Sequence, residues 1–388
     1  MENKTLSSGE IYSNTEADKL GNHIDYLVVG SGLFGSVFVH EMTKAGKKCL
    51  IIEKKNHIGG NCYTENKDGI NIHTYGPHIF HTNDKSIWEW INQFTEFHNY
   101  RHSPRVSYKN KTFSFPINLM TLHQLWGVNT PKEAEDKLKE VSIKNDNPQN
   151  LEEWILSQVG EDIYNTFIKG YTQKQWNKDP KELPTSIIKR LPIRTNFDDN
   201  YFFDKYQGIP VGGYTQIFEK MLQGIEVKTG VDYFENKEYW NYLADKIVFT
   251  GKIDEFFDYQ FGELEYRSLE FKNERLEMND YQGCSIVNYT EFDIPYTRIT
   301  EHKHFENSKS DVTWITKEYP KDYKRGETPY YPINDDKNNK IYNQYKELSK
   351  QHTNIIFGGR LSEYKYYDMH QIIGSALSKV KKELSNEK

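Results

Sequence analysis

The sequence predicts an α/β fold that is organised around a parallel sheet and carries a mainly helical insertion and a second, mainly antiparallel sheet. Three observations near the N-terminus support the parallel sheet. A short apolar run over residues 26–29 ends in a Gly-x-Gly-x-x-Gly turn that starts at Gly30, a helical pattern follows, and a second apolar run ends in Glu53. A buried strand, a glycine turn, a helix and a second buried strand together form the βαβ unit of a dinucleotide-binding fold.

The three glycines of this Rossmann-like turn have different tasks. Gly30 permits the tight turn, Gly32 allows the backbone to approach a pyrophosphate, and Gly35 allows the helix to pack closely on the strand. The helix N-terminus offers free N–H groups and a partial positive charge to that pyrophosphate. Glu53 stands where a carboxylate accepts hydrogen bonds from the adenosine ribose. The alternative is a glycine-rich turn that only connects core elements.

The segment after the second strand favours FAD over NAD. It reads Glu53-Lys-Lys-Asn-His-Ile-Gly-Gly-Asn61 and resembles the FAD-binding start of amine-oxidase-like and glutathione-reductase-like flavoproteins. Paired glycines let a second stretch of backbone approach the cofactor diphosphate, and basic side chains offset its charge. A strand that ends in Gly-Gly-Arg360 offers another phosphate site, so we expect the first and last segments to meet on one FAD. The sequence contains no second Gly-x-Gly-x-x-Gly motif, so it gives no indication of a separate NAD(P) domain.

The composition excludes several classes of protein. The 388 residues carry a formal net charge of -6 and contain no basic block, which argues against a nucleic-acid-binding protein. No apolar run approaches membrane-spanning length, and the N-terminus has no signal-peptide core. The 3 cysteines form no CxxC pair, which fits a reducing cytoplasm. The 28 tyrosines suit a polar ligand with a ring and phosphates, although an aromatic core accounts for most of them.

The pattern along the chain predicts five segments. Helical periodicity dominates the segment that follows the first βαβ unit, and β-like runs follow at 264–271, 285–289, 297–304 and 312–316. We therefore expect a disordered extension over 1–23, a first FAD-binding part over 24–83, a mainly helical insertion with a substrate lid over 84–192, an antiparallel-sheet domain with further FAD-domain strands over 193–330, and a last FAD-binding part over 331–388.

Local signals place individual elements. Lys109-Asn110 predicts a short hairpin, and both Thr130-Pro131 and Asn150 predict helix N-termini. Residues 171–180 read as a polar loop that leaves a helix and contains one large aromatic side chain. Residues 329–332 read as a rigid aromatic turn.

Several side chains have both a structural and a functional interpretation. Trp176 is either packed or part of a mobile lid over a ligand. His78, in a Tyr-Gly-Pro-His turn, is either a hydrogen-bonded structural residue or part of a loop against a flavin. Arg190 has the planar fork that suits phosphate, and the alternative is a solvated surface residue. No nearby carboxylate completes a ligand set for the histidines, so we predict no metal site.

Seven motifs resemble the bacterial UDP-galactopyranose mutase family. They are Gly30-Ser-Gly-Leu-Phe-Gly35, His57-Ile-Gly-Gly-Asn61, Tyr75-Gly-Pro-His-Ile-Phe-His-Thr82, Gly170-Tyr-Thr-Gln-Lys-Gln-Trp176, Gln207-Gly-Ile-Pro-Val-Gly-Gly-Tyr214, Pro295-Tyr-Thr-Arg298 and Phe357-Gly-Gly-Arg-Leu-Ser-Glu-Tyr-Lys-Tyr-Tyr-Asp-Met369. The resemblance spans about Asp25 to the C-terminus. The chain departs from the family in its polar N-terminal extension and in Pro77, where many members have alanine.

The resemblance implies an isomerase that interconverts the pyranose and furanose forms of UDP-galactose and supplies galactofuranose for cell-surface glycans. It implies FAD that is active when reduced, with no net redox change. In the family's mechanism reduced flavin N5 attacks the anomeric carbon and UDP leaves; the adduct opens, the sugar C4 hydroxyl closes on C1, and UDP returns. The protein has to hold the leaving UDP, which arginines, tyrosines and a lid can do.

The resemblance also implies the site residues. Catalysis is expected to depend on Arg190, Arg298 and His78. Substrate binding is expected from Phe167 and Tyr171 at the uracil ring, Trp176 on the lid, Arg190 and Arg298 at the pyrophosphate, the hydroxyls of Tyr201, Tyr331 and Tyr366, and Asn288. Cofactor binding is expected from Gly30, Gly32, Phe34, Gly35, Glu53, Lys54, Gly60, Asn61, His78, Arg360, Tyr367, Asp368 and Met369.

The implied partners are UDP-galactopyranose, UDP-galactofuranose, an external reductant such as NAD(P)H or a flavodoxin-type donor, and a second copy of the chain in a homodimer in the cytoplasm. Nucleic acid and a membrane span are not expected. Two other functions stay open: an amine-oxidase-like flavin oxidoreductase, against which the arginines and the aromatic loop argue, and a non-catalytic nucleotide-sugar or flavin-binding module. The sequence leaves open whether UDP-N-acetylgalactosamine is also a substrate.

Overall fold

The structure is a computed structural model that describes residues 23–185 and 193–386. The chain forms two compact units. Unit 1 comprises the chain up to Gly60, Phe218–Leu264 and the chain from Asn334, and unit 2 comprises Asn61–Ile217 and Glu265–Ile333. The predicted disordered extension falls almost wholly on residues outside the described part.

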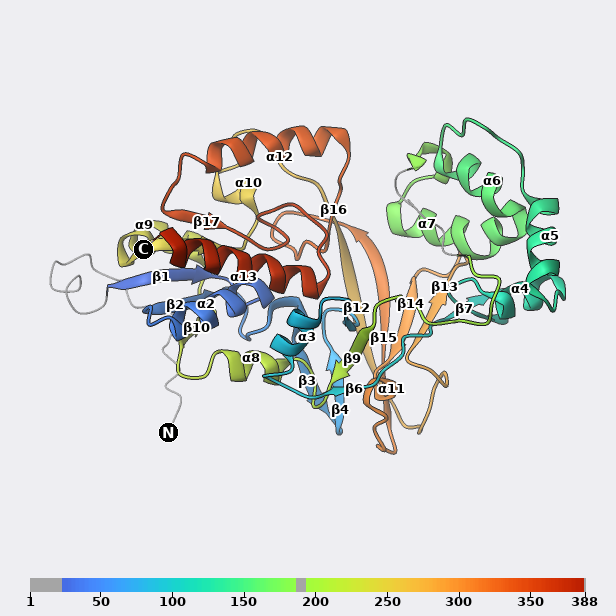
Figure 1. Cartoon of the computed structure of the whole chain (residues 1–388), viewed down its shortest axis with the longest axis horizontal. Helices are drawn as coiled ribbons and strands as arrows, with labels where there is room; N and C mark the ends of the chain where they lie inside the picture. Colours follow the sequence, from blue (N-terminus) through green and yellow to red (C-terminus); the bar gives the residue numbers. More distant parts are fainter. Residues whose placement is uncertain (1–22, 186–192, 387–388) are drawn as a thin grey trace. The chain divides into compact units, whose positions relative to one another are not determined.

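Unit 1 is built on a parallel sheet of five strands in the order β10-β2-β1-β11-β17 (Figure 1). The strands are β1 (Ile24–Val29), β2 (Cys49–Glu53), β10 (Glu226–Thr229), β11 (Ala244–Phe249) and β17 (Ile355–Phe357). In β1, Leu27 and Val28 are fully buried although they point to opposite faces. A continuous apolar run is what a parallel sheet with both faces covered requires, so the predicted parallel sheet is confirmed.

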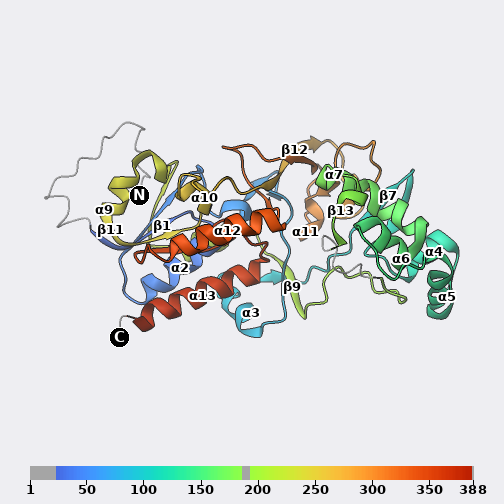
Figure 2. The ribbon, with the colours of Figure 1, turned by 90° about the horizontal axis from the view of Figure 1, so that it is seen from above.

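Helices cover this sheet. They are α2 (Leu33–Lys44), α9 (Lys237–Leu243), α10 (Ile253–Phe256), α12 (Asp336–Ser349) and α13 (Met369–Asn386), with a 3₁₀ turn η5 (Tyr233–Asn236). The first and last helices of the unit, α2 and α13, pack on each other, and α12 packs on α10. Figure 2 shows α12 and α13 running in nearly the same direction. The two ends of the chain are therefore built into one unit.

Unit 2 contains a seven-stranded sheet in the order β16-β12-β15-β14-β13-β7-β8. Its strands are β7 (Arg105–Tyr108), β8 (Lys111–Ser114), β12 (Tyr266–Leu276), β13 (Ile286–Tyr289), β14 (Arg298–Glu301), β15 (Thr313–Asp322) and β16 (Tyr331–Pro332). Every pairing is antiparallel except that between β13 and β7. The predicted antiparallel sheet is confirmed with this one parallel exception.

Smaller elements complete unit 2. Two further sheets pair β3 with β4 and β5 with β9 and β6. Their strands are β3 (Thr64–Lys67), β4 (Ile70–His73), β5 (Phe80–Thr82), β6 (Phe97–His98) and β9 (Tyr206–Pro210), and the remaining helices near them are α3 (Lys85–Ile91) and α11 (Lys303–Glu306). The elements η1 (Gly60–Cys62) and α8 (Thr215–Met221) lie where the chain passes from one unit to the other.

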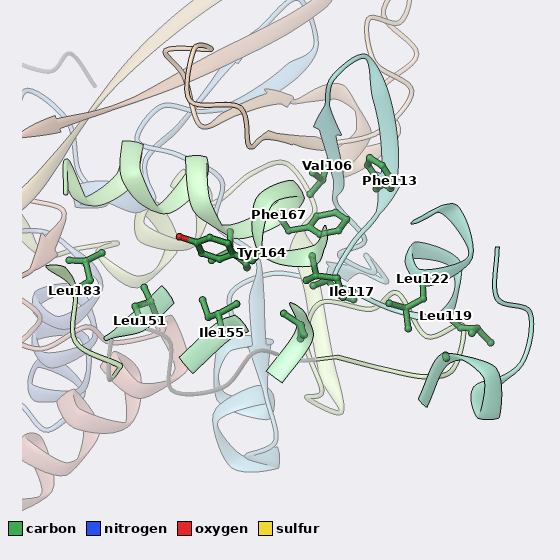
Figure 3. Close-up of a cluster of buried hydrophobic side chains, with 14 residues drawn as sticks. Val106, Phe113, Ile117, Leu119, Leu122, Leu151, Ile155, Tyr164, Phe167 and Leu183 are labelled. Atoms are coloured by element: carbon green, nitrogen blue, oxygen red, sulfur yellow. The ribbon is translucent and has the colours of Figure 1, made fainter. Parts of the chain in front are cut away.

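A helical cluster in unit 2 packs around an apolar core (Figure 3). Its elements are α4 (Leu119–Trp126), α5 (Pro131–Val141), α6 (Leu151–Ile163), η2 (Tyr164–Ile168), α7 (Lys169–Trp176) and η3 (Pro180–Glu182). The element η2 is a π-helical turn that leads directly into α7. Side chains from these helices pack against Val106 and Phe113 of the β7–β8 hairpin. The helical cluster and the large sheet thus share a core.

Most local predictions are confirmed and two are corrected. The hairpin turns at Lys109 and Asn110, which both have positive φ, and Thr130 and Asn150 cap α5 and α6 through backbone N–H groups three residues on. Besides this hairpin, which is β7 and β8, the segment 84–192 contains the short strand β6. Residues 171–176 continue α7 and do not leave as a loop. The predicted aromatic turn at 329–332 contains β16, which pairs with β12.

Candidate functional site

In the glycine turn between β1 and α2, an added side chain would have room at Gly32 but not at Gly30 or Gly35. A Cβ atom at Gly35 would lie 2.1 Å from the carbonyl oxygen of Gly30, and Gly30 itself has a φ of +105°. Side chains are therefore excluded at both positions. A Cβ atom at Gly32 would meet nothing within 4 Å. Because Gly32 caps the N-terminus of α2, the open space lies where a ligand phosphate would receive backbone N–H groups.

Glu53 holds this turn in place. Its Oε2 accepts hydrogen bonds of 2.8 Å from both the backbone N–H and the hydroxyl of Ser31, and its Oε1 accepts one of 2.9 Å from the N–H of Lys55. The side chain is only 7% exposed. Its predicted role at a ribose remains a prediction. Neighbouring Lys54 forms an ion pair of 2.7 Å with Asp232.

Two other segments of unit 1 approach the same turn. The N–H of Gly59 donates to the carbonyl of Ser31 at 3.0 Å, and a Cβ atom at Gly60 would lie 3.0 Å from the Cα of Gly32. From the far end of the chain, a Cβ atom at Gly358 would lie 2.1 Å from the ring of Phe34. The first and last segments therefore meet at the glycine turn, as the sequence predicts.

The cofactor-site residues predicted near the C-terminus lie between the end of β17 and the start of α13. The guanidinium of Arg360 lies 5.0 Å from the ring centre of Tyr366, which is 57% exposed. Burial, and then the carboxylate of Glu363, raise the pKa of Tyr367, so its hydroxyl stays protonated at neutral pH. Asp368 and Met369 lie at the start of α13, and the backbone N–H of Asp368 donates to the side chain of Gln371.

In unit 2, strand register brings predicted site residues into one row. Asn288 of β13 is directly opposite Arg298 of β14, and Arg298 is directly opposite Glu318 of β15. Residues opposite each other in antiparallel strands project to the same face. The amide, guanidinium and carboxylate therefore stand side by side on one face of the sheet.

Arg298 is the electrostatic centre of this row. Its Nε lies 3.2 Å from Oε1 of Glu318, and its Nη2 donates to the Tyr171 hydroxyl at 3.5 Å. Burial works against its charge, but the Glu318 carboxylate raises the pKa of Arg298 above its ordinary value. The Arg298 side chain is 23% exposed, and a guanidinium is a group that suits an anionic ligand.

The two aromatic residues predicted at the uracil ring have different surroundings. Phe167 is 4% exposed and lies in the helical core, with its ring 5.4 Å from that of Phe113 (Figure 3). Tyr171 is next to Arg298, and burial raises the pKa of its hydroxyl, which therefore remains a donor. Trp176, at the end of α7, packs against the same core as Phe167 and is partly buried.

Among the remaining predicted residues of unit 2, Tyr201 and His78 lie on loops, whereas Tyr331 lies in β16. The N–H of Tyr201 donates to the carbonyl of His102 at 2.7 Å, and 45% of Tyr201 is exposed. His78 donates from its backbone N–H to Nδ1 of His73 at 3.1 Å and from its own Nδ1 to the carbonyl of Gly76 at 2.8 Å. Asn61 lies in η1. Arg190 lies outside the described residues.

Two family models match the chain. The model of UDP-galactopyranose mutase matches residues 166–366, and that of an NAD(P)-binding Rossmann-like domain matches residues 28–94. The first covers the whole row from Asn288 to Glu318, and the second covers the glycine turn. The chain belongs to the UDP-galactopyranose mutase family.

Relatives along nearly the whole chain support this membership. A dTDP-fucopyranose mutase of Escherichia coli is 41% identical over 381 residues, which cover 93% of this chain and 99% of the relative. A probable UDP-galactopyranose mutase of Klebsiella pneumoniae is 38% identical, covering 94% and 96%, and a UDP-galactopyranose mutase of Mycoplasma genitalium is 32% identical, also covering 94% and 96%. The predicted family and the predicted isomerase class are confirmed.

Solved structures confirm the fold of the family. A crystal structure of reduced UDP-galactopyranose mutase superposes with a TM-score of 0.70 at 14% identity and covers 93% of this chain and 96% of that one. A putrescine oxidase superposes with a TM-score of 0.54 at 11% identity, covering 93% and 99%. The amine-oxidase-like alternative thus shares the fold with this family. None of the helices in the described residues is long and apolar enough to cross a lipid bilayer.

Three further side chains support the unit 2 site. Glu318 is the partner of Arg298, and only the register of β14 and β15 reveals it. Arg194 donates from Nη1 to the carbonyls of Asp198 and Asn200 at 3.0 and 2.5 Å, and so fixes the segment that precedes Tyr201. Lys174 is buried and binds backbone oxygens. The sequence signals for Lys174 are its place in the Gly170–Trp176 motif and its spacing of four residues from Gly170.

Proposed function

We propose that the protein interconverts UDP-galactopyranose and UDP-galactofuranose without net redox change, using FAD in its reduced form. The row of Asn288, Arg298 and Glu318 carries this proposal. It offers one partly exposed cation, held between a carboxylate and the Tyr171 hydroxyl, to a diphosphate. An amine substrate would have no use for such a cation, since like charges repel.

FAD fits the glycine turn of unit 1. The space in front of Gly32 is open, the N-terminus of α2 supplies backbone donors, and the Gly59–Gly60 and Gly358–Gly359 pairs permit close approach of backbone. We propose that Glu53, Arg360 and the start of α13 hold the remaining parts of the cofactor. Reduced FAD supplies the nucleophile for the anomeric carbon, so the chain needs no nucleophilic side chain of its own.

The side chains of unit 2 have to keep UDP in place while the sugar is rearranged. We propose that Arg298, together with Arg190, holds the diphosphate, and that the hydroxyls of Tyr171, Tyr201 and Tyr331 donate to its oxygens. Holding a departed leaving group close to the sugar makes its return effectively intramolecular. Positioned cations and hydroxyls also stabilise the negative charge that develops as UDP leaves.

A second candidate substrate is dTDP-fucopyranose, because a relative that is 41% identical along 93% of the chain is a mutase of that sugar nucleotide. The two substrates share the pyrimidine base and the diphosphate. They differ in the base methyl group, the ribose 2′-hydroxyl and the sugar C6 hydroxyl. The same arginine and tyrosines would hold the diphosphate of either one.

The deciding experiment presents both sugar nucleotides to the purified protein. UDP-galactofuranose and dTDP-fucopyranose are incubated separately with and without dithionite, and the products are separated by HPLC. We expect UDP-galactofuranose to be converted only when the reductant is present, and we expect the reductant not to be consumed in stoichiometric amounts. Conversion of the dTDP sugar alone would transfer the proposal to that substrate, and oxygen uptake on an amine with no conversion of either sugar would favour the oxidase.

We further propose a cytoplasmic homodimer that receives electrons from NAD(P)H or a flavodoxin-type donor and supplies galactofuranose for cell-surface glycans. These proposals rest on the family resemblance. Light scattering coupled to size-exclusion chromatography tests the dimer: a mass near twice 45.9 kDa supports it, and a mass near 45.9 kDa contradicts it.

A further inference from the structure

One face of the η2–α7 helix is attached at three points to the connection between β13 and β14. The attachment points are Thr166, Gly170 and Lys174, which follow one another at intervals of four residues and so share a face. The Thr290 hydroxyl donates to the carbonyl of Thr166 at 2.5 Å. A Cβ atom at Gly170 would lie 2.3 Å from the carbonyl oxygen of Thr290, so the helix and the connection touch backbone to backbone.

Lys174 is the strongest of these attachments. Its Nζ donates to the carbonyls of Tyr289, Ile294 and Tyr296 at 2.7, 3.0 and 2.9 Å. An ammonium group has three N–H donors, and all three are used here on one stretch of backbone. The side chain is only 9% exposed, so these oxygens replace the water that the charge gives up.

The stretch of backbone that Lys174 binds leads directly into the candidate site. Tyr289 and Tyr296 lie at the two ends of the connection, and Arg298 follows Tyr296 by two residues. On the helix, Lys174 is three residues after Tyr171, whose hydroxyl accepts the hydrogen bond from Arg298. The ammonium therefore ties the element that carries Tyr171 to the element that carries Arg298.

We propose that Lys174 is a positioning residue, which fixes the 290–297 connection to α7 and thereby sets the place of the Arg298 guanidinium beside Tyr171. The attachment itself follows from the contacts above. Its consequence for a substrate rests on the proposed function, in which Arg298 binds the diphosphate. Lys174 itself touches no reacting group.

Hydrogen exchange of the flavin-loaded protein tests the attachment without any nucleotide. Lys174→Met keeps the length and apolar stem of the side chain and removes its three donors. We expect amide exchange over residues 290–298 to accelerate at least about tenfold while peptides of unit 1 keep the wild-type rates. Lys139→Met, an exposed lysine on α5, is the matched control and should change nothing. Unchanged exchange over 290–298 would overturn the proposal.

A double-mutant cycle on UDP affinity tests the action through Arg298. Displacement of a fluorescent UDP conjugate is measured for wild type, Lys174→Met, Arg298→Ala and the double variant. Lys174→Met should weaken UDP binding about tenfold when Arg298 is present and less than twofold when it is absent. Equal losses in both backgrounds would show a general structural effect and overturn the positioning role.

Two controls separate this inference from the proposed function. If Lys174→Met does not fold, Lys174→Gln, which keeps an N–H donor pair, replaces it in both experiments, and faster exchange over 290–298 is again the expected result. If the wild-type protein binds no UDP, the proposed function fails, while the exchange experiment still decides whether Lys174 holds the connection.

Discussion

The Nε atom of Arg298 lies 3.2 Å from Oε1 of Glu318, which is directly opposite it on the neighbouring strand, and the Glu318 side chain is only 4% exposed. A buried carboxylate thus fixes the guanidinium on its Nε side, while Nη2 faces the Tyr171 hydroxyl. Thr297 supports the carboxylate, because its hydroxyl lies 3.3 Å from the same Oε1 atom. Two predictions follow from this pair, one for each partner.

Replacing Arg298 with alanine should nearly abolish turnover. Removing one donor to a developing negative charge typically costs about 100- to 1,000-fold in rate. We expect a loss of about that size in kcat/KM for the sugar nucleotide, with flavin content unchanged because the glycine turn belongs to the other unit. Arg275→Ala, at an exposed position of β12, is the control. Near-normal turnover of the Arg298 variant would remove this residue from the site.

Replacing Glu318 with glutamine should destabilise the fold. The change leaves the Arg298 cation without its counter-charge, and breaking a buried ion pair typically costs about 3–5 kcal/mol. Because Arg298 is partly exposed, we expect about 2–3 kcal/mol in the free energy of unfolding by urea. Glu274→Gln, in the exposed pair with Lys317, should cost less than about 1 kcal/mol. Equal effects of the two substitutions would contradict this account.

The glycine turn allows a prediction that separates folding from cofactor binding. Gly32→Ala adds a methyl group to open space at an ordinary φ of −67°, so the apoprotein should keep its melting temperature. The same methyl group should obstruct the cofactor phosphate and lower the retained flavin, measured as the ratio of absorbance at 450 and 280 nm. Gly35→Ala should instead prevent folding, because its Cβ would clash with the Gly30 carbonyl. A fully flavinated Gly32→Ala protein would contradict the proposed site.

A histidine in unit 2 should make stability depend on pH. The carboxylate of Glu301, and also that of Asp280, each 3.3 Å away, raise the pKa of His304. Although burial opposes it, hydrogen bonds from His304, Thr313 and two backbone N–H groups lower the pKa of Glu301 to about 2, so the acid is charged at every working pH.

A histidine whose pKa is raised in the folded state contributes stability below its unfolded pKa and loses that contribution as pH rises through the folded value. His304→Gln should therefore cost about 1 kcal/mol at pH 5.5 and clearly less at pH 9, measured by urea unfolding at both values. An equal cost of His304→Gln at both pH values would refute the ion pair.

The sequence by itself determined the features that depend on local backbone chemistry. The tight turn at Gly30 and the close approach at Gly35 need glycine for steric reasons that act over a few residues, so the βαβ unit was readable. The hairpin at Lys109-Asn110 and the helix caps at Thr130 and Asn150 are local in the same way. The family motifs then placed Arg298 and Tyr171 in one predicted site, and in the structure these two side chains are in contact.

Only the tertiary structure decided how distant residues meet. The row from Asn288 through Arg298 to Glu318 depends on the register of three strands, and a shift of one residue would turn each side chain to the other face. Residues 171–176 are polar enough to read as a loop, yet they remain helical where Lys174 finds three carbonyl oxygens on another segment. Phe167 is drawn into the helical core by packing against Phe113. Intrinsic propensity and sequence motifs describe one segment of the chain. The burial and hydrogen bonding of that segment depend on a second segment, and only the folded chain shows which segment that is.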